Sequence, residues 1–155
     1  MQKLDELIAV SPVFAGLGAD DLTLVAGCGR NHGYEAGELI AGDGDAADTF
    51  FLIRQGRVAL EMHTPAQGGL IIETLDPGDI VGWAWLFPPY RWHYDVRAIE
   101  PVRGVIFDGA CLRGKLEERK ELGYELMLRF AQVMNDRLQH TRFRLLDVYG
   151  TAVLS

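Results

Sequence analysis

A short stretch of the sequence, residues 78–98, combines turn-forming glycine with aromatic, imidazole and guanidinium side chains. Gly82 would let the backbone approach a bound ligand closely, because glycine has no Cβ atom. An aromatic run and two prolines follow it, and then a segment that we predict to be a strand carrying Arg91, His93 and Arg97. Free backbone N–H groups and an arginine would bind an anion such as a phosphate in such a place.

The aromatic side chains of this stretch also allow a second interpretation, in which they fill a hydrophobic core. They are Trp83, Trp85, Phe87, Trp92 and Tyr94. Composition alone favours a filled core over a ligand pocket, because large aromatic side chains are most often used for packing. Both interpretations stay open at the level of the sequence.

The other chemistry-bearing residues do not form a catalytic or metal-binding pattern. The histidines have no pair at i, i+2 or i, i+4 that would face a metal ion together; they are His32, His63, His93 and His140. A calcium loop is suggested by three aspartates but lacks its closing glutamate; they are Asp43, Asp45 and Asp48. We therefore predict no catalytic residue, no metal ligand and no cofactor.

The cysteines and the overall composition indicate an ordinary cytoplasmic domain. Cys28 and Cys111 form no C-x-x-C pair, so we predict two small buried side chains. A length of 155 residues suits one domain, residues 1–155. We find neither a signal peptide nor a membrane-spanning stretch. The net charge of -7 argues against binding to a nucleic-acid backbone.

The periodicity of the chain changes twice, which predicts three regions. Residues 1–30 indicate short helices, the second of them capped by Asp20. Residues 31–107 contain short β-rich segments between glycines, which predicts an antiparallel β-barrel or jelly roll. The segments are 38–41, 49–53, 57–62, 70–75 and 102–107. Residues 108–148 favour helices, with a break at Gly123.

A stripe of mostly apolar residues runs along the last predicted helix. Its members are Met127, Phe130, Met134, Leu138, Thr141, Leu145 and Val148. Their mean spacing of about 3.5 residues is typical of a coiled-coil seam between two subunits. A helix packed on its own barrel is an equally good interpretation, and the two are compatible if Leu126 and Val133 face the barrel while the stripe faces a partner.

A set of glycines and apolar residues resembles the framework of cyclic-nucleotide-binding domains. The set comprises Gly37-Glu38, Gly44-Asp45, residues 51–53, Gly56, Val58, Leu75, Gly78-Asp79 and Gly82. Residues 137–141 are similar to the dimerisation helix of the catabolite activator and related bacterial regulators. The resemblance covers nearly all of the chain. It implies an eight-stranded jelly roll, a phosphate-binding cassette and a long helix that pairs two subunits.

The cassette departs from the family pattern at two positions. Trp83 stands where the family has a glutamate that binds the ribose, and Trp92 stands where it has a phosphate-binding arginine. Arg91 lies one position away from that arginine, whereas Thr141 matches the residue that contacts the purine. A charge-assisted bond is worth roughly 1.5–3 kcal/mol, so losing two would weaken binding by about two or more powers of ten. We expect weak binding of cyclic AMP at best.

These arguments favour a non-enzymatic regulatory homodimer that senses a nucleotide-like or aromatic small molecule and signals to an unknown protein partner. The ligand-binding residues that we predict are Gly82, Trp83, Ala84, Arg91, Trp92, His93 and Thr141. One alternative is a transcription regulator of the catabolite-activator type, acting through DNA or a DNA-binding partner. The sequence ends at Ser155 without the helix-turn-helix of those regulators. A metal-dependent jelly-roll enzyme is a further alternative, which the histidine spacing does not support.

Overall fold

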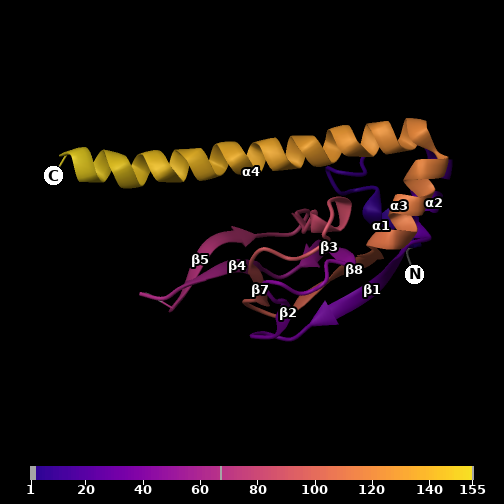
Figure 1. The fold of residues 1–155 in the computed structure, drawn as a ribbon. Coiled ribbons are helices and arrows are strands. Elements are labelled where there is room, and N and C mark those ends of the chain that lie inside the picture. Colours follow the sequence, from indigo (N-terminus) through magenta and orange to yellow (C-terminus); the bar gives the residue numbers. More distant parts are fainter. Residues whose placement is uncertain (1–2, 67, 155) are drawn as a thin grey trace.

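Two antiparallel sheets, a group of short helices and one long helix make up the molecule in the computed structural model (Figure 1). The structure describes residues 3–66 and 68–154, with side chains up to residue 150. One sheet has the strand order β1-β8-β3-β6 and the other β2-β7-β4-β5. The strands are β1 (Gly29–Tyr34), β2 (Leu39–Ala41), β3 (Thr49–Gln55), β4 (Val58–Thr64), β5 (Gly68–Leu75), β6 (Ile80–Val81), β7 (Asp95–Ala98) and β8 (Val102–Asp108). This arrangement confirms the predicted jelly roll of eight strands.

Alternation along β3 divides the core into two parts. Phe50 and Leu52 point toward the helices, whereas Phe51 and Ile53 point between the two sheets. The antiparallel pairing of β3 with β8 places Leu52 opposite Val105, on the helix side of the same sheet. One face of this sheet therefore lines the jelly roll and the other supports the helices.

The N-terminal helices are short, as predicted, but their capping differs. They are α1 (Leu4–Ile8) and α2 (Ala19–Ala26). Gly18, not Asp20, is the N-cap of α2, and no side chain bonds to the free amides. Asp20 lies one residue inside the helix, where its charge still complements the positive end of the helix dipole.

The C-terminal region forms two helices, and their boundary is not at Gly123. They are α3 (Gly109–Glu118) and α4 (Lys120–Leu154), separated at Arg119. Gly123 lies inside α4, where a Cβ atom would come within 2.9 Å of the Leu116 carbonyl oxygen. The glycine therefore allows α3 and α4 to pack closely, and it does not end a helix.

Cys28 and Cys111 form a disulfide, which corrects the prediction of two separate side chains. Cys28 lies between α2 and β1, and Cys111 lies in the first turn of α3. They are 83 residues apart in the sequence, so spacing alone gave no sign of the pairing. The bond fastens α3 to the N-terminal helical region.

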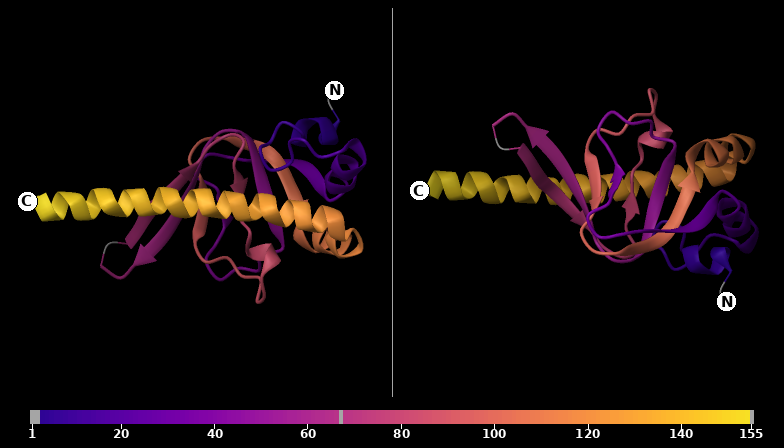
Figure 2. Two further views of the ribbon diagram at one scale, coloured as in Figure 1. Left: turned by 90° about the horizontal axis from the view of Figure 1, so that it is seen from above. Right: turned by 90° about the horizontal axis from the view of Figure 1, so that it is seen from below.

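The long helix α4 divides its apolar residues between two surroundings. Its first half packs on the domain, with Leu122, Leu126 and Phe130 fully or nearly buried. Its second half extends past the β4–β5 hairpin, and Leu138 and Leu145 are about half exposed there (Figure 2). The stripe predicted as one seam is therefore split, because Phe130 belongs to the domain's own core.

Among the described residues, no helix is both long enough and apolar enough to cross a membrane.

Candidate functional site

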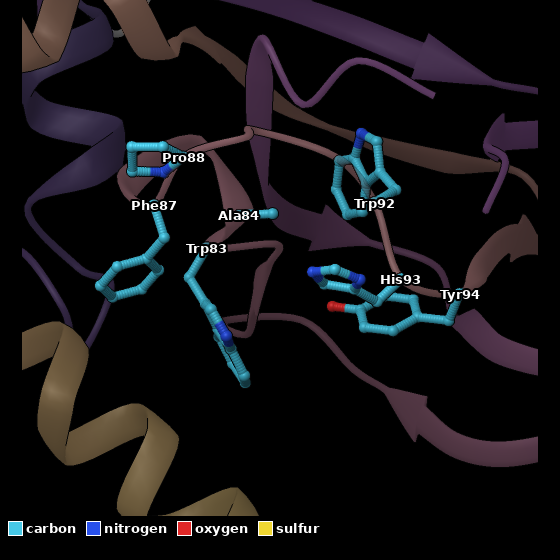
Figure 3. Close-up of a pocket in the computed structure, with 7 residues that line it drawn as sticks. All are labelled: Trp83, Ala84, Phe87, Pro88, Trp92, His93 and Tyr94. Atoms are coloured by element: carbon cyan, nitrogen blue, oxygen red, sulfur yellow. The ribbon is translucent and has the colours of Figure 1, made fainter. Parts of the chain in front are cut away.

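The loop between β6 and β7 builds a small pocket beside α4. After Gly82 the chain forms a single 3₁₀ turn, η1 (Ala84–Leu86), and returns through Pro88 and Pro89 to β7. The pocket has a volume of about 210 Å³. Its lining is mostly aromatic and comprises Trp83, Ala84, Phe87, Pro88, Trp92, His93 and Tyr94 (Figure 3).

Trp92 occupies the space that Gly82 leaves open. Gly82 has a φ of +95°, and a Cβ atom there would lie 2.8 Å from Trp92 Cζ3 and still closer to Cη2. The indole is 5% exposed and belongs to the core between the sheets. The glycine that we expected to face a ligand therefore faces a tryptophan ring.

Arg137 brings a buried positive charge from α4 against Trp83, which lines the pocket, although Arg137 itself is not one of the lining residues. Its guanidinium lies over the Trp83 ring, 4.9 Å from the centroid, and Nη2 donates a hydrogen bond to the Ile80 carbonyl. Nη1 is buried and has no hydrogen-bond partner among the described residues. An unsatisfied buried donor costs about 1–3 kcal/mol, so a ligand acceptor that reached Nη1 past the Trp83 ring would be favourable.

Burial also changes the proton affinity of the groups around this pocket. Desolvation lowers the pKa of Arg137, while the nearby charge of Glu73 partly opposes that change. Desolvation raises the pKa of the Tyr94 hydroxyl, and the Arg137 charge acts in the opposite direction. Tyr94 therefore stays neutral near pH 7, and Arg137 is the group that carries a positive charge.

Arg91 lies outside the pocket. It is exposed, forms an isolated β-bridge with Ala46, and its Nη1 donates to the Gly44 carbonyl at 3.4 Å. The strand that we predicted to carry Arg91 and His93 begins only at Asp95. Both residues precede β7 in an irregular segment, and of the two only His93 lines the pocket.

The remaining predicted ligand-binding residues fall into two groups. Trp83, Ala84 and Trp92 line the pocket, with Gly82 directly behind Trp92. Thr141 is exposed on α4, one turn beyond Arg137, and does not line it. Which of these residues bind a ligand stays a prediction.

The aromatic stretch serves both uses that the sequence left open. Trp85 is fully buried and stacks on Phe50 with ring centroids 4.7 Å apart, so it fills the core beneath the helices. Trp92 fills the core between the sheets. Trp83 and Phe87 line the pocket, and Phe87 is 55% exposed.

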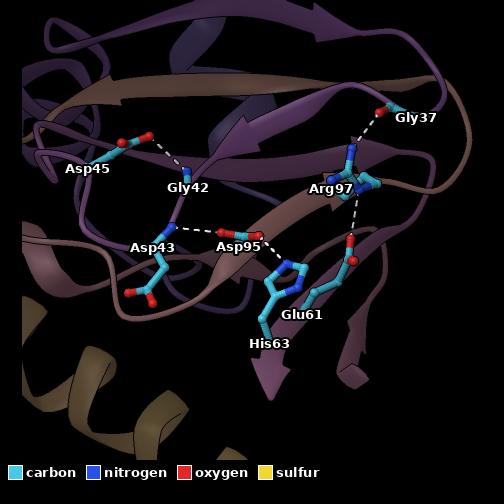
Figure 4. Close-up of polar contacts among 8 residues, drawn as sticks. All are labelled: Gly37, Gly42, Asp43, Asp45, Glu61, His63, Asp95 and Arg97. Carbon is cyan, nitrogen blue, oxygen red and sulfur yellow. Dashed lines mark hydrogen bonds and ion pairs between the residues drawn. The ribbon is translucent and has the colours of Figure 1, made fainter. Parts of the chain in front are cut away.

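A polar network supports β7 next to the pocket (Figure 4). The Asp95 carboxylate accepts a hydrogen bond from the Asp43 amide and contacts His63 Nε2, both at 2.8 Å. The Asp43 hydrogen bond, followed by the contact with His63, lowers the pKa of Asp95 despite its desolvation. Two residues along, Arg97 pairs with Glu61 at 2.8 Å. The network fixes the end of the pocket loop to β4 and the β2–β3 loop.

Arg137 and Tyr94 are not among the residues that the sequence predicts for the site. The sequence places Tyr94 in an aromatic patch and Arg137 only in the dimerisation helix. The sequence does contain a clue to the place of Arg137. It precedes Thr141, a predicted ligand-binding residue, by four residues and therefore lies on the same face of a helix. No group of three or more histidine, cysteine or acidic side chains suited to a metal ion occurs among the described residues.

Comparisons with known sequences identify a family profile and one kind of regulator. The profile of the cyclic nucleotide-binding domain matches residues 32–119. A CRP-like cAMP-activated global transcriptional regulator of Mycobacterium tuberculosis is 23% identical over 150 residues, or 97% of this chain. The chain spans 65% of the length of that regulator.

Solved structures share the fold. One from Geobacter metallireducens, described as a cyclic nucleotide-binding protein, is 30% identical, with a TM-score of 0.77 over 89% of this chain and 99% of its own. A cyclic nucleotide-binding domain from Methylobacillus flagellatus has a TM-score of 0.80 at 18% identity, covering 93% of this chain and 81% of its own. The Thermus thermophilus catabolite activator protein has a TM-score of 0.71 at 20% identity, covering 90% of this chain and 63% of its own.

Proposed function

Since this chain belongs to the cyclic nucleotide-binding domain family, we propose that it is a non-enzymatic sensor domain for a flat, acidic small molecule other than cyclic AMP. The ligand would enter the pocket beside Trp83 and place its acidic group at Arg137. No bond is made or broken in this function, which rests on binding alone. The protein would act in the cytoplasm and pass the state of the pocket to a partner through α4.

The position of Trp92 is the observation that carries the proposal. Its indole fills the space over Gly82, and the remaining pocket of about 210 Å³ is smaller than the roughly 300–1,000 Å³ of pockets that enclose drug-sized ligands. Trp83 also replaces the glutamate that the family resemblance implies for the ribose. Cyclic AMP would have to displace an indole and would lose two polar contacts.

Arg137 gives the ligand its expected charge. It combines a buried guanidinium, an unsatisfied Nη1 and a face-on contact with Trp83. Arginine binds carboxylate and phosphate groups through paired donors, and such charge-assisted bonds are about twice as strong as neutral ones. An aromatic ring stacked on Trp83 would add about 1–3 kcal/mol. A planar carboxylate or phosphate therefore fits this pocket best.

A second function, transcription regulation, is favoured by the match to the Mycobacterium tuberculosis regulator over 97% of this chain. In that case α4 would transmit the ligand signal to DNA directly or to a DNA-binding partner. Sequence-specific complexes in a mobility shift with genomic fragments at low salt would support this function over a sensor that acts through another protein.

The test is calorimetric titration of the full chain with cyclic AMP, cyclic GMP, cyclic dinucleotides and a set of planar aromatic acids. We expect millimolar or weaker binding of the nucleotides and tighter binding of at least one acid. Arg137→Gln should weaken that acid about tenfold or more. Arg144→Gln is the matched control, because Arg144 also donates from α4 to a sheet carbonyl, that of Ile72.

The outcome for cyclic AMP decides the proposal. Micromolar binding of cyclic AMP to the wild type would overturn it. Trp92→Ala should improve the affinity for cyclic AMP, because it empties the space over Gly82. Arg91→Ala belongs in the same series. If this variant binds a phosphate-containing ligand more weakly than the wild type does, Arg91 has the phosphate-binding role that the sequence predicts.

A further inference from the structure

A second hollow lies on the outer face of the sheet formed by β1, β8 and β3. It has a volume of about 500 Å³ and is open to solvent. Its lining is polar and comprises Asn31, His32, Gly33, Arg54, Arg103 and Gly104. None of these residues lines the pocket beside Trp83. In Figure 1, β1 lies on the side of the molecule away from α4.

The strand pattern explains why two arginines meet in this hollow. On β8, Arg103 precedes Val105 on the same face. On β3, Arg54 lies at a register irregularity between Ile53 and Gln55, and it lines the hollow together with Arg103. Leu52 and Val105 are buried in the core beneath the helices, whereas both arginines are exposed. The helices therefore cover one end of this face and leave its basic end uncovered.

Gly33 has no side chain and therefore leaves space in the hollow beside Arg103. The two residues are paired across β1 and β8. A Cβ atom on Gly33 would lie 3.3 Å from the Val102 carbonyl oxygen and 3.8 Å from Arg103 Cγ. A larger residue at position 33 would crowd the arginine stem and fill the space in front of it.

The charges of Arg54 and Arg103 are uncompensated. Neither side chain forms a hydrogen bond or an ion pair within the described part of the chain, and no carboxylate lines the hollow. Other arginines are paired with acids, as Arg57 is with Asp76. The chain has a net charge of -7, but two free guanidinium groups with no acid beside them create a positive electrostatic potential in this hollow.

We propose that this hollow is a second binding site, separate from the sensor pocket, for the phosphate group of a small phosphorylated molecule. The two guanidinium groups would supply paired donors to the phosphate oxygens. The His32 ring and the Asn31 amide line the same hollow and would hydrogen-bond the rest of the ligand. The open mouth suits a charged ligand that stays partly in water.

The test uses inorganic pyrophosphate as the probe for the full chain at low ionic strength. Calorimetry gives the dissociation constant, and amide shifts of the ¹⁵N-labelled protein locate the site. We expect shifts at residues 31–33 and 103–104. Arg54→Ala and Arg103→Ala should each weaken binding about tenfold, and the double variant about a hundredfold. Arg57→Ala removes the same charge elsewhere on the surface and should change binding less than twofold.

Results of three kinds would overturn the proposal. One is the absence of pyrophosphate binding at about 10 mM, where even a weak phosphate site would be occupied. Another is unchanged affinity in the double variant, or shifts confined to Trp83 and its neighbours, which would move the anion to the sensor pocket. The third is binding of an acidic peptide through these arginines without binding of pyrophosphate, which would make the hollow a protein-docking surface.

Discussion

Gly82 and Trp92 depend on each other, because the indole occupies the space that any side chain at residue 82 would need. Two separate effects therefore exclude other residues at position 82. The φ of +95° is unfavourable for a residue with a Cβ atom, and the Cβ atom would also overlap the ring. A control is available in Gly44, which has a φ of +88° but would place a Cβ atom in open space, with no other atom within 4 Å.

We expect Gly82→Ala to destabilise the domain more than Gly44→Ala does. The free energy of unfolding of the control, Gly44→Ala, should fall by about 1–2 kcal/mol because of the left-handed backbone alone. Gly82→Ala should lose a further 1–3 kcal/mol, roughly the cost of overpacking a core. Urea unfolding followed by tryptophan fluorescence measures both. Equal losses would mean that the indole is free to move away, and the pocket would then open more readily than we propose.

Asp95 makes the stability of the domain dependent on pH. The pKa of its carboxyl is lowered below the ordinary value of 3.8 by the Asp43 amide and His63, so the folded state favours the charged form. The resulting stabilisation is complete above the unfolded pKa and is lost as the pH falls through the folded one. The affected window therefore lies around and below pH 4.

Asp95→Asn should remove this dependence. We expect the variant to be less stable than the wild type at pH 7 and to lose less stability between pH 5 and pH 3, as measured by urea midpoints. Asp43→Asn is the control, because Asp43 contributes its backbone amide to the network. A parallel fall in stability for wild type and Asp95→Asn would assign the acid sensitivity to other carboxylates.

At the scale of elements, α3 connects the disulfide to the pocket loop. Cys111 ties the start of α3 to Cys28. From the same helix, Arg113 donates to the Trp85 carbonyl and lies over the Tyr90 ring, 4.3 Å from its centroid. The loop that carries the pocket is thus held by a helix whose own position is covalently fixed.

Reducing the disulfide should lower the free energy of unfolding by about 2–4 kcal/mol, because it frees a loop of 83 residues in the unfolded chain. Urea midpoints with and without a dithiol reductant measure the effect. The double variant Cys28→Ser/Cys111→Ser should match the reduced wild type and ignore the reductant. If the reductant leaves the wild-type midpoint unchanged, the bond does not contribute to stability.

The sequence predicted elements well where periodicity and glycine punctuation are strong. The five predicted β-segments correspond to β2, β3, β4, β5 and β8, but β7 was expected to begin several residues before Asp95. Strand β1 was missed as a separate element because Gly29–Tyr34 is polar and mostly exposed. The disulfide and the Arg137–Trp83 contact were missed because each joins residues that only the folded chain brings together.

At the scale of the whole molecule, the outer half of α4 leaves a large apolar surface without a partner inside the described chain. Its exposed side chains are Leu138, Phe143, Leu145, Leu146, Val148 and Tyr149. Exposed apolar surface of this kind marks an interaction site. The spacing of Leu138 and Leu145 by seven residues is that of a coiled-coil seam. These features support the homodimer that the sequence predicts.

We expect the full chain to sediment as a dimer, and Leu138→Glu/Leu145→Glu to convert it to a monomer. Each leucine buried in the interface contributes about 1.5–3 kcal/mol, and a symmetric dimer loses four of them, so the dissociation constant should rise roughly ten-thousandfold or more. Gln139→Glu adds charge to the same half of α4 without removing an apolar side chain, so that variant should stay dimeric. A monomeric wild type at micromolar concentration would assign the exposed half of α4 to a different partner and remove the homodimer from the proposed signalling route.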